Sequence, residues 1–173
     1  MSEHDVQLAS EETFLASYHG RRFRAKHHDR EVLTFRIGPE IYGVDIEAMR
    51  EISKLRPVTE VPRAPGFLPG IITLRGTVVP IIDLRMRMGL AAAEPTRASR
   101  ILIVDYDGEP YGLIVDAVIR VVRMVDDQIE ASPLPGGIDS EFLTGLARDE
   151  GDLIVLLNLA AVVTFPIEVD RER

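Results

Sequence analysis

The chain contains two copies of one apolar pattern, and this internal repeat restricts the folds open to it more than any single motif. Residues 111–120 align with residues 42–51 at a constant offset of 69. Residues 142–159 align with residues 67–84 at an offset of 75, without gaps, and nearly every apolar position stays apolar. A single unit of about 70 residues has only a small core. We therefore predict a duplicated β unit whose two copies bury the faces that each alone would expose.

The stretch Pro65–Arg85 contains the central hairpin of the first copy. Two apolar runs, 70–74 and 77–84, meet at Arg75-Gly76. This pattern is typical of two largely buried strands joined by a tight turn. We expect Arg75, the one charged residue at that turn, to face outward.

The segments on either side of this hairpin predict further β structure. Strands are expected over 32–37 and 41–46, separated by a Gly-Pro-Glu turn. Residues 48–52 fit either a short helical turn or a strand. Four prolines predict a short strand and an irregular loop over 57–69, and Asp105–Gly108 is expected to form a hairpin turn.

A comparison of the two copies separates positions that serve the fold from positions that differ in kind. Gly70 and Gly76 recur as Gly145 and Gly151, so we expect backbone conformations or close approaches that a Cβ would hinder. Arg75, in contrast, corresponds to Glu150. This reversal of charge indicates that the fold does not require an arginine there.

Composition excludes several classes of protein. With 173 residues, of which 46% are hydrophobic, the chain forms one domain or two small ones sharing a core. It has no cysteine, which excludes disulfides, thiolate metal sites and cysteine nucleophiles. The net charge of −8 argues against nucleic-acid binding. The polar first thirty residues lack a signal peptide, so we expect a cytoplasmic protein.

The residue types available for acid–base catalysis are few. All 4 histidines lie before residue 29, and lysine occurs only at Lys26 and Lys54, so carboxylates remain the only acid–base set. Asp83 and Asp116 are the candidates for a small carboxylate hydrolase, although Asp83 is expected to cap the segment after its strand. The clustered loop acids lack EF-hand spacing, so we predict no metal site.

The chain divides into an extension, two β units and a tail. We assign 1–30 to an extension with a short helix over 11–18, capped by Ser10, and a basic cluster at Arg21–Lys26 that either meets an acidic partner or is a solvated arm. The first unit is placed at about 31–90, the second at about 99–165, with an Ala-rich linker at 91–98 between them. Residues 166–173 form a C-terminal tail.

The segment from Tyr42 to Ile52 is more apolar than one buried face requires. Two interpretations fit Val44, Ile46 and Met49: simple core packing, or an exposed apolar patch that contacts another protein.

Several motifs follow one another in a fixed order over residues 31–165. They are Tyr42-Gly43-Val44-Asp45-Ile46, Met49-Arg50-Glu51-Ile52, Leu74-Arg75-Gly76, Val79-Pro80-Ile81-Ile82-Asp83-Leu84-Arg85, Phe142-Leu143-Thr144-Gly145 and Leu156-Leu157-Asn158-Leu159. In this order they resemble the CheW-like adaptor domain of bacterial chemosensory arrays. Thr73 replaces the usual Asn of that family and Met49 the usual β-branched residue, which leaves the receptor class in question.

The resemblance implies a mainly β fold with short helices, made of two SH3-like five-stranded β-barrel subdomains packed together, and an adaptor without catalysis or cofactor. It implies two partners, the regulatory domain of a CheA-type histidine kinase and the cytoplasmic tip of methyl-accepting chemoreceptors. The expected place is the cytoplasm, at membrane-associated receptor arrays, with the membrane reached only through the receptors and no nucleic-acid partner.

Residue roles also follow from the resemblance alone. The implied receptor-binding residues are Arg75, Leu74, Met49 and Glu51. The implied kinase-binding residues are Gly70, Val44 and Ile46. Two alternatives stay open: a CheW-like adaptor of a divergent or non-motility pathway that has lost one partner, and the carboxylate hydrolase.

Overall fold

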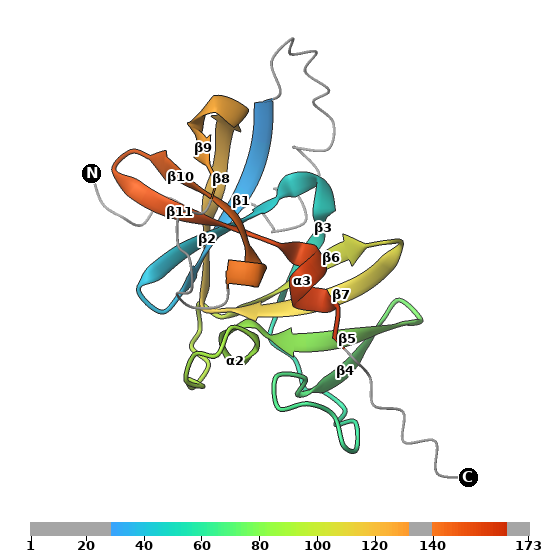
Figure 1. Ribbon diagram of the computed structural model, residues 1–173. Helices are drawn as coiled ribbons and strands as arrows, with labels where there is room; N and C mark the ends of the chain where they lie inside the picture. The colour runs from blue at the N-terminus through green and yellow to red at the C-terminus, as the bar shows by residue number, and fades with distance from the viewer. Residues whose placement is uncertain (1–28, 132–139, 166–173) are drawn as a thin grey trace.

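The computed structural model describes residues 29–131 and 140–165 (Figure 1). The helix expected over 11–18, its cap Ser10, the basic cluster Arg21–Lys26 and the tail 166–173 lie outside these residues.

Eleven strands form two sheets among the described residues. The six-stranded sheet has the order β8-β1-β2-β11-β10-β9, and the five-stranded sheet has the order β3-β6-β7-β5-β4. The strands are β1 (Asp29–Ile37), β2 (Glu40–Asp45), β3 (Met49–Lys54), β4 (Gly70–Leu74), β5 (Thr77–Asp83), β6 (Arg100–Tyr106), β7 (Glu109–Val115), β8 (Ala117–Val125), β9 (Ile129–Glu130), β10 (Leu143–Asp149) and β11 (Asp152–Leu157).

The helical segments are short. They are η1 (Ile46–Ala48), α2 (Leu84–Arg87), η2 (Asp126–Gln128), η3 (Ser140–Phe142) and α3 (Leu159–Val163). Within the described ranges, none of them has the length and apolar character needed to cross a lipid bilayer. The prediction of a mainly β fold with short helices is confirmed; one sheet has six strands rather than five because the two-residue β9 pairs with β10.

The local predictions around the first hairpins are confirmed except for the short strand expected within 57–69, which does not form. Residues 48–52 combine both alternatives, since η1 ends at Ala48 and β3 begins at Met49. In the loop 57–69 the only strand-like pairing is an isolated bridge between Thr59 and Ile71.

Each sheet combines strands from both copies of the repeat. The hairpin β1–β2 of the first copy joins β8–β11 of the second, and the hairpin β6–β7 of the second copy joins β3–β5 of the first. Parallel pairs connect the copies, β2 with β11 and β5 with β7. Each sheet therefore contains strands from both sides of the linker 91–98. Antiparallel hairpins form locally, but their sheet neighbours are chosen by long-range pairing.

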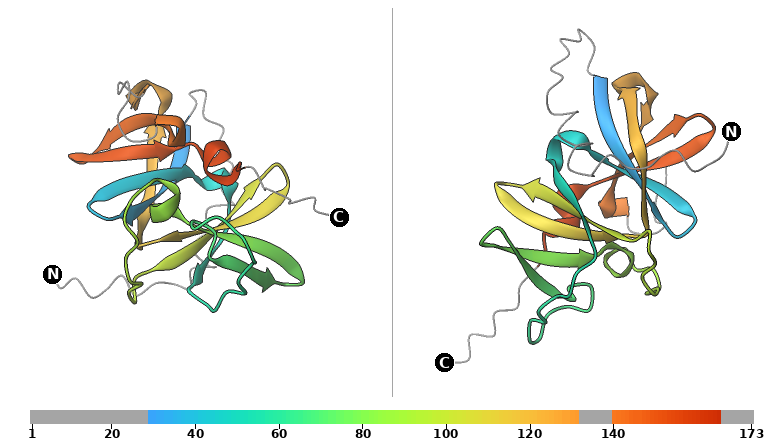
Figure 2. Two further views of the ribbon diagram at one scale, coloured as in Figure 1. Left: turned by 60° about the horizontal axis from the view of Figure 1, so that its bottom comes forward. Right: turned by 180° about the vertical axis from the view of Figure 1, so that it is seen from behind.

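Three hairpins turn through two residues with left-handed backbone. The pairs are Arg75-Gly76 (φ 49° and 80°), Asp107-Gly108 (52° and 80°) and Glu150-Gly151 (48° and 87°). Two successive positive φ angles define the turn that matches the twist of antiparallel strands, and glycine takes the second position without steric cost. The hairpin β4–β5 and its equivalent β10–β11 point to opposite sides of the molecule in every view (Figures 1 and 2).

The largest cluster of buried side chains draws on both sheets. It includes Leu33 and Phe35 of β1, Ile82 of β5, Leu102 of β6 and Leu113 of β7, none of which is exposed at all. Burying one such side chain contributes roughly 1.5–3 kcal/mol. The two copies thus share one core, which explains why neither repeat needs to be stable alone.

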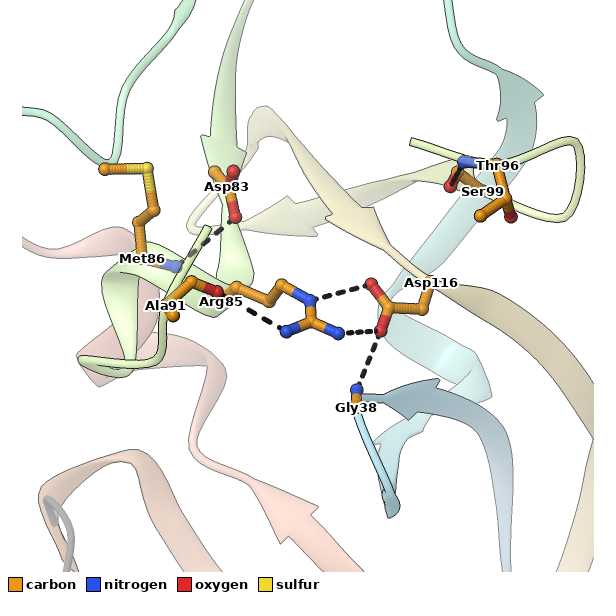
Figure 3. Close-up of polar contacts among 8 residues, drawn as sticks. All are labelled: Gly38, Asp83, Arg85, Met86, Ala91, Thr96, Ser99 and Asp116. Atoms are coloured by element: carbon orange, nitrogen blue, oxygen red, sulfur yellow. Dashed lines mark hydrogen bonds and ion pairs between the residues drawn. The ribbon is translucent and has the colours of Figure 1, made fainter. Parts of the chain in front are cut away.

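A clasp around Asp116 ties three segments together (Figure 3). Its carboxylate accepts hydrogen bonds from Arg85 Nε at 3.1 Å, Arg85 Nη2 at 2.6 Å and the Gly38 amide at 2.7 Å. The Arg85 bond is the main cause that lowers the pKa of Asp116. The clasp joins the first turn of the domain, α2 and the start of β8.

Candidate functional site

An ion pair between Arg75 and Glu51 lies at the tip of the β4–β5 hairpin. Arg75 Nη1 donates to Glu51 Oε2; the arginine side chain is 68% exposed and the glutamate 14%. Glu51 lies on β3, one edge of the five-stranded sheet, and Arg75 follows β4, the other edge. The pair therefore connects the two edges of a curled sheet while the guanidinium remains open to solvent.

The second copy carries the opposite charges at the two equivalent positions, but its arginine lies closest to an aspartate, Asp149, that aligns with Leu74. Arg120 occupies the position of Glu51 at the offset of 69, and Glu150 that of Arg75 at the offset of 75. Arg120 Nη2 lies 2.6 Å from Asp149 Oδ2 and 3.6 Å from Glu150 Oε2. The fold thus accepts either polarity at this place. The polarity at the first tip is free to serve recognition.

An open hollow lies where the β2–η1 corner faces β10, β11 and α3. Its volume is about 400 Å³, and it is lined by Arg30, Val44, Asp45, Ala48, Thr144, Leu157 and Leu159. Arg30 and Asp45 form a bidentate pair at its edge, with nitrogen–oxygen distances of 3.1 and 2.8 Å. The hydrogen bond to Asp45 raises the pKa of Arg30. The hollow therefore combines an apolar floor with one fixed pair of charges.

The apolar residues assigned to partner binding lie inside the protein. Val44, Ile46 and Met49 are 3%, 8% and 2% exposed and belong to the shared core. Between the two interpretations of this segment, the structure therefore selects core packing. Val44 still reaches the hollow. Leu74 is half-buried and packs beside a smaller cluster within the five-stranded sheet.

Gly70 holds the loop 57–69 close to β4. A Cβ at Gly70 would lie 2.3 Å from the carbonyl oxygen of Thr59. Thr59 and Ile71 exchange two backbone hydrogen bonds of 2.9 Å at this point. Any side chain at position 70 would push the loop outward, together with Val61, which is 39% exposed at its surface. Gly70 thus sets the position of an exposed apolar loop.

The carboxylates considered for hydrolysis have structural roles. Asp83 caps α2 by accepting from the Met86 amide, and Asp116 belongs to the clasp with Arg85 (Figure 3). In residues 29–131 and 140–165, no three His, Cys, Asp or Glu side chains gather as metal ligands would. No observation brings two carboxylates into an acid–base pair.

Sequence reasoning missed most of the hollow. Arg30 lies at the predicted boundary with the extension, and Thr144, Leu157 and Leu159 belong to the repeat and to the family motifs without a predicted binding role. The motif containing Asp45 was recognised, but its arginine partner lies 15 residues away in sequence. The parallel pairing of β2 with β11, which forms the hollow, cannot be recognised from a local sequence pattern.

The fold and site define the class: a duplicated, two-sheet β domain with a surface hollow where its two copies meet. The family model of the CheW-like domain matches residues 31–165, so the chain belongs to this family. A chemotaxis protein CheW of Rhizobium meliloti (strain 1021) is 38% identical over 144 residues, covering 83% of this chain and 91% of the relative. Protein FrzA of Myxococcus xanthus is 28% identical over 137 residues, covering 78% and 86%.

A solved structure agrees with the assignment. The scaffolding protein TtCheW from Thermoanaerobacter tengcongensis matches with a TM-score of 0.75 and 35% sequence identity, over 79% of this chain and 93% of that one.

Proposed function

We propose that this protein is a non-enzymatic scaffold that couples chemoreceptors to a CheA-type histidine kinase. Membership of the CheW-like family supports the scaffold role. The observation that carries the proposal is the hollow, because an open, partly apolar recess between two β units suits one apolar ridge of a helix. The tip of a chemoreceptor is the helical partner we assign to it.

On the receptor side, we assign the ion pair at the tip of the β4–β5 hairpin the role of orienting the bound receptor helix. The exposed guanidinium of Arg75 can donate to a carboxylate or carbonyl of the partner while Glu51 keeps it in place. In this proposal Met49 and Leu74 do not contact the receptor; they stabilise β3 and β4 by packing beneath the surface. Val44, expected on the kinase side, joins the receptor side because it lines the hollow.

We assign kinase binding to the loop 57–69, whose position is set by Gly70. Its Val61 is 39% exposed beside the exposed Glu60 and Arg63, and its prolines restrict the backbone, so a like-folded regulatory domain can bury this apolar contact. Gly70 then acts through the loop rather than by contact, and Ile46 through the shared core. This assignment keeps the two partners on different elements, as coupling requires.

Two titrations test the proposal, one with a soluble receptor-tip fragment and one with the isolated kinase regulatory domain. Ala48→Trp fills the hollow and should abolish receptor binding only, whereas Ala92→Trp in the exposed linker should not. Val61→Asp should weaken kinase binding, whereas Ile119→Asp, at a residue of equal exposure (38% against 39%), should not. Binding of the receptor alone by the wild type would indicate the divergent adaptor with one partner. Binding of neither would refute the proposal.

A further inference from the structure

An arginine of the first copy is enclosed by aromatic rings at the junction with the second copy. The Cζ of Arg87, the last residue of α2, lies 4.5 Å from the ring centroid of Phe67, 4.9 Å from that of Phe142 and 5.8 Å from that of Phe165. The rings of Phe67 and Phe165 meet edge to face at 5.1 Å. A guanidinium over aromatic faces is held by their quadrupoles. The position of this side chain is therefore well determined.

The same guanidinium closes the end of α3. Arg87 Nε donates to the carbonyl of Val162 at 2.9 Å, and Nη2 donates to those of Ala161 and Thr164, both at 3.0 Å. The last carbonyls of a helix have no partner within it, and a cation there also favours the helix dipole. A helix of 5 residues is too short to persist by its own hydrogen bonds. Arg87 is thus a main support of α3.

Among the described residues this support occurs once, although the surrounding structure is duplicated. Phe67 and Phe142 are equivalent by the offset of 75, and each accepts a backbone hydrogen bond, from Asp83 at 2.8 Å and from Asn158 at 2.7 Å. Arg87, by the same offset, corresponds to Val162. A single arginine therefore lies between two equivalent phenylalanines and connects α2 of one copy with α3 of the other.

The other end of α3 forms a wall of the hollow. Leu159, its first residue, lines the hollow together with Leu157 of β11. We propose that Arg87 is a positioning residue: it fixes α3 and thereby places Leu159 for a partner that Arg87 never touches. The proposal rests on the assignment of the hollow to a helical receptor partner. It is independent of which polar contacts that partner makes.

The test compares two arginines of the same short helix. Arg87→Lys keeps the positive charge among the rings but loses the fork that reaches three carbonyls. Arg85→Lys breaks the clasp to Asp116 and makes no change at α3. Each variant is titrated with the receptor-tip fragment and the kinase regulatory domain, and amide hydrogen exchange is followed at Val162 and Thr164, which donate within α3.

We expect Arg87→Lys to weaken receptor binding by about tenfold, as the loss of one charge-assisted hydrogen bond would, and to speed exchange at Thr164. Kinase binding should fall by less than receptor binding, because the retained cation still lies over Phe67 of the loop 57–69, and Arg85→Lys should change neither receptor binding nor exchange in α3. Unchanged receptor binding in Arg87→Lys, or equal loss in Arg85→Lys, would overturn the positioning role. If the wild type binds no receptor fragment, the proposed function is refuted. In that case amide exchange still tests the structural part of the proposal: unchanged exchange at Thr164 in Arg87→Lys would refute the stabilisation of α3 by Arg87.

Discussion

Exchanging the charges of the Arg75–Glu51 pair separates its contribution to the fold from its contribution to recognition. Arg75→Glu alone copies the residue of the second repeat but places it beside Glu51. The backbone should accept it, since Glu150 has a φ of 48° against 49° for Arg75. The double variant Glu51→Arg with Arg75→Glu gives the pair the polarity of Arg120 and Glu150, without the aspartate that lies closer to Arg120, Asp149 at 2.6 Å.

The magnitudes follow from the exposure of the two partners. A solvent-exposed ion pair contributes about 0.2–1 kcal/mol, and we take about 1 kcal/mol because Glu51 is only 14% exposed. Two like charges near 4 Å in a solvent-screened place add about 1 kcal/mol of repulsion. The single variant should then lose about 2 kcal/mol, or about 4–8 °C in Tm for a domain of this size. The double variant should return to within about 0.5 kcal/mol of the wild type.

Thermal unfolding and receptor titration of the wild type, the single variant and the double variant distinguish the two contributions. If Arg75 donates to the receptor, the single and the double variant lose binding alike, although only the single variant is destabilised. A double variant that recovers both stability and binding would show that the pair is purely structural. That result would refute the role we assign to the guanidinium.

Three further changes have effects that the structure predicts. Arg85 lowers the pKa of Asp116 below its ordinary 3.8, so the stabilisation by this carboxylate is present at neutral pH and is lost as pH falls through that range. Asp116→Asn should therefore lower Tm at pH 7 and approach the wild type toward pH 3, and a constant difference across pH would contradict this. Gly70→Ala meets a backbone oxygen at 2.3 Å and should cost about 1–3 kcal/mol with faster amide exchange in the loop 57–69. Its control Gly76→Ala, with open space but a φ of 80°, should cost about 1 kcal/mol and leave that loop unchanged. Asn158→Ala should lose about 1 kcal/mol with the cap of α3. Asn158→Ser, which like alanine loses the donor to the Glu141 carbonyl but keeps an oxygen for the Ala161 amide, should lose less, and chemical denaturation with equal losses for both would contradict the capping role.

Local features of the fold were predictable from the residues. Arg75-Gly76 forms the expected turn, and the turn expected over Asp105–Gly108 is narrowed to Asp107-Gly108, because the preference of glycine for positive φ does not depend on distant contacts. Asp83 caps α2 as expected, since its side chain reaches an amide three residues on. The site was predicted only in part: Arg75 and Glu51 meet at the surface, whereas Val44, Ile46 and Met49 lie in the core. Apolar character alone does not distinguish a core position from an exposed one.

The sequence by itself determined the hairpins, the turns and the cap of α2, because each depends on residues within a few positions of one another, and it showed the duplication as a repeated apolar pattern. The tertiary structure alone decided which hairpins share a sheet, since the parallel pairing of β2 with β11 and of β5 with β7 joins strands from different copies. It also decided the exchanged ion pairs, the hollow and the enclosure of Arg87. Each of these joins residues at least 15 positions apart, most of them on strands or helices that meet only in the folded domain.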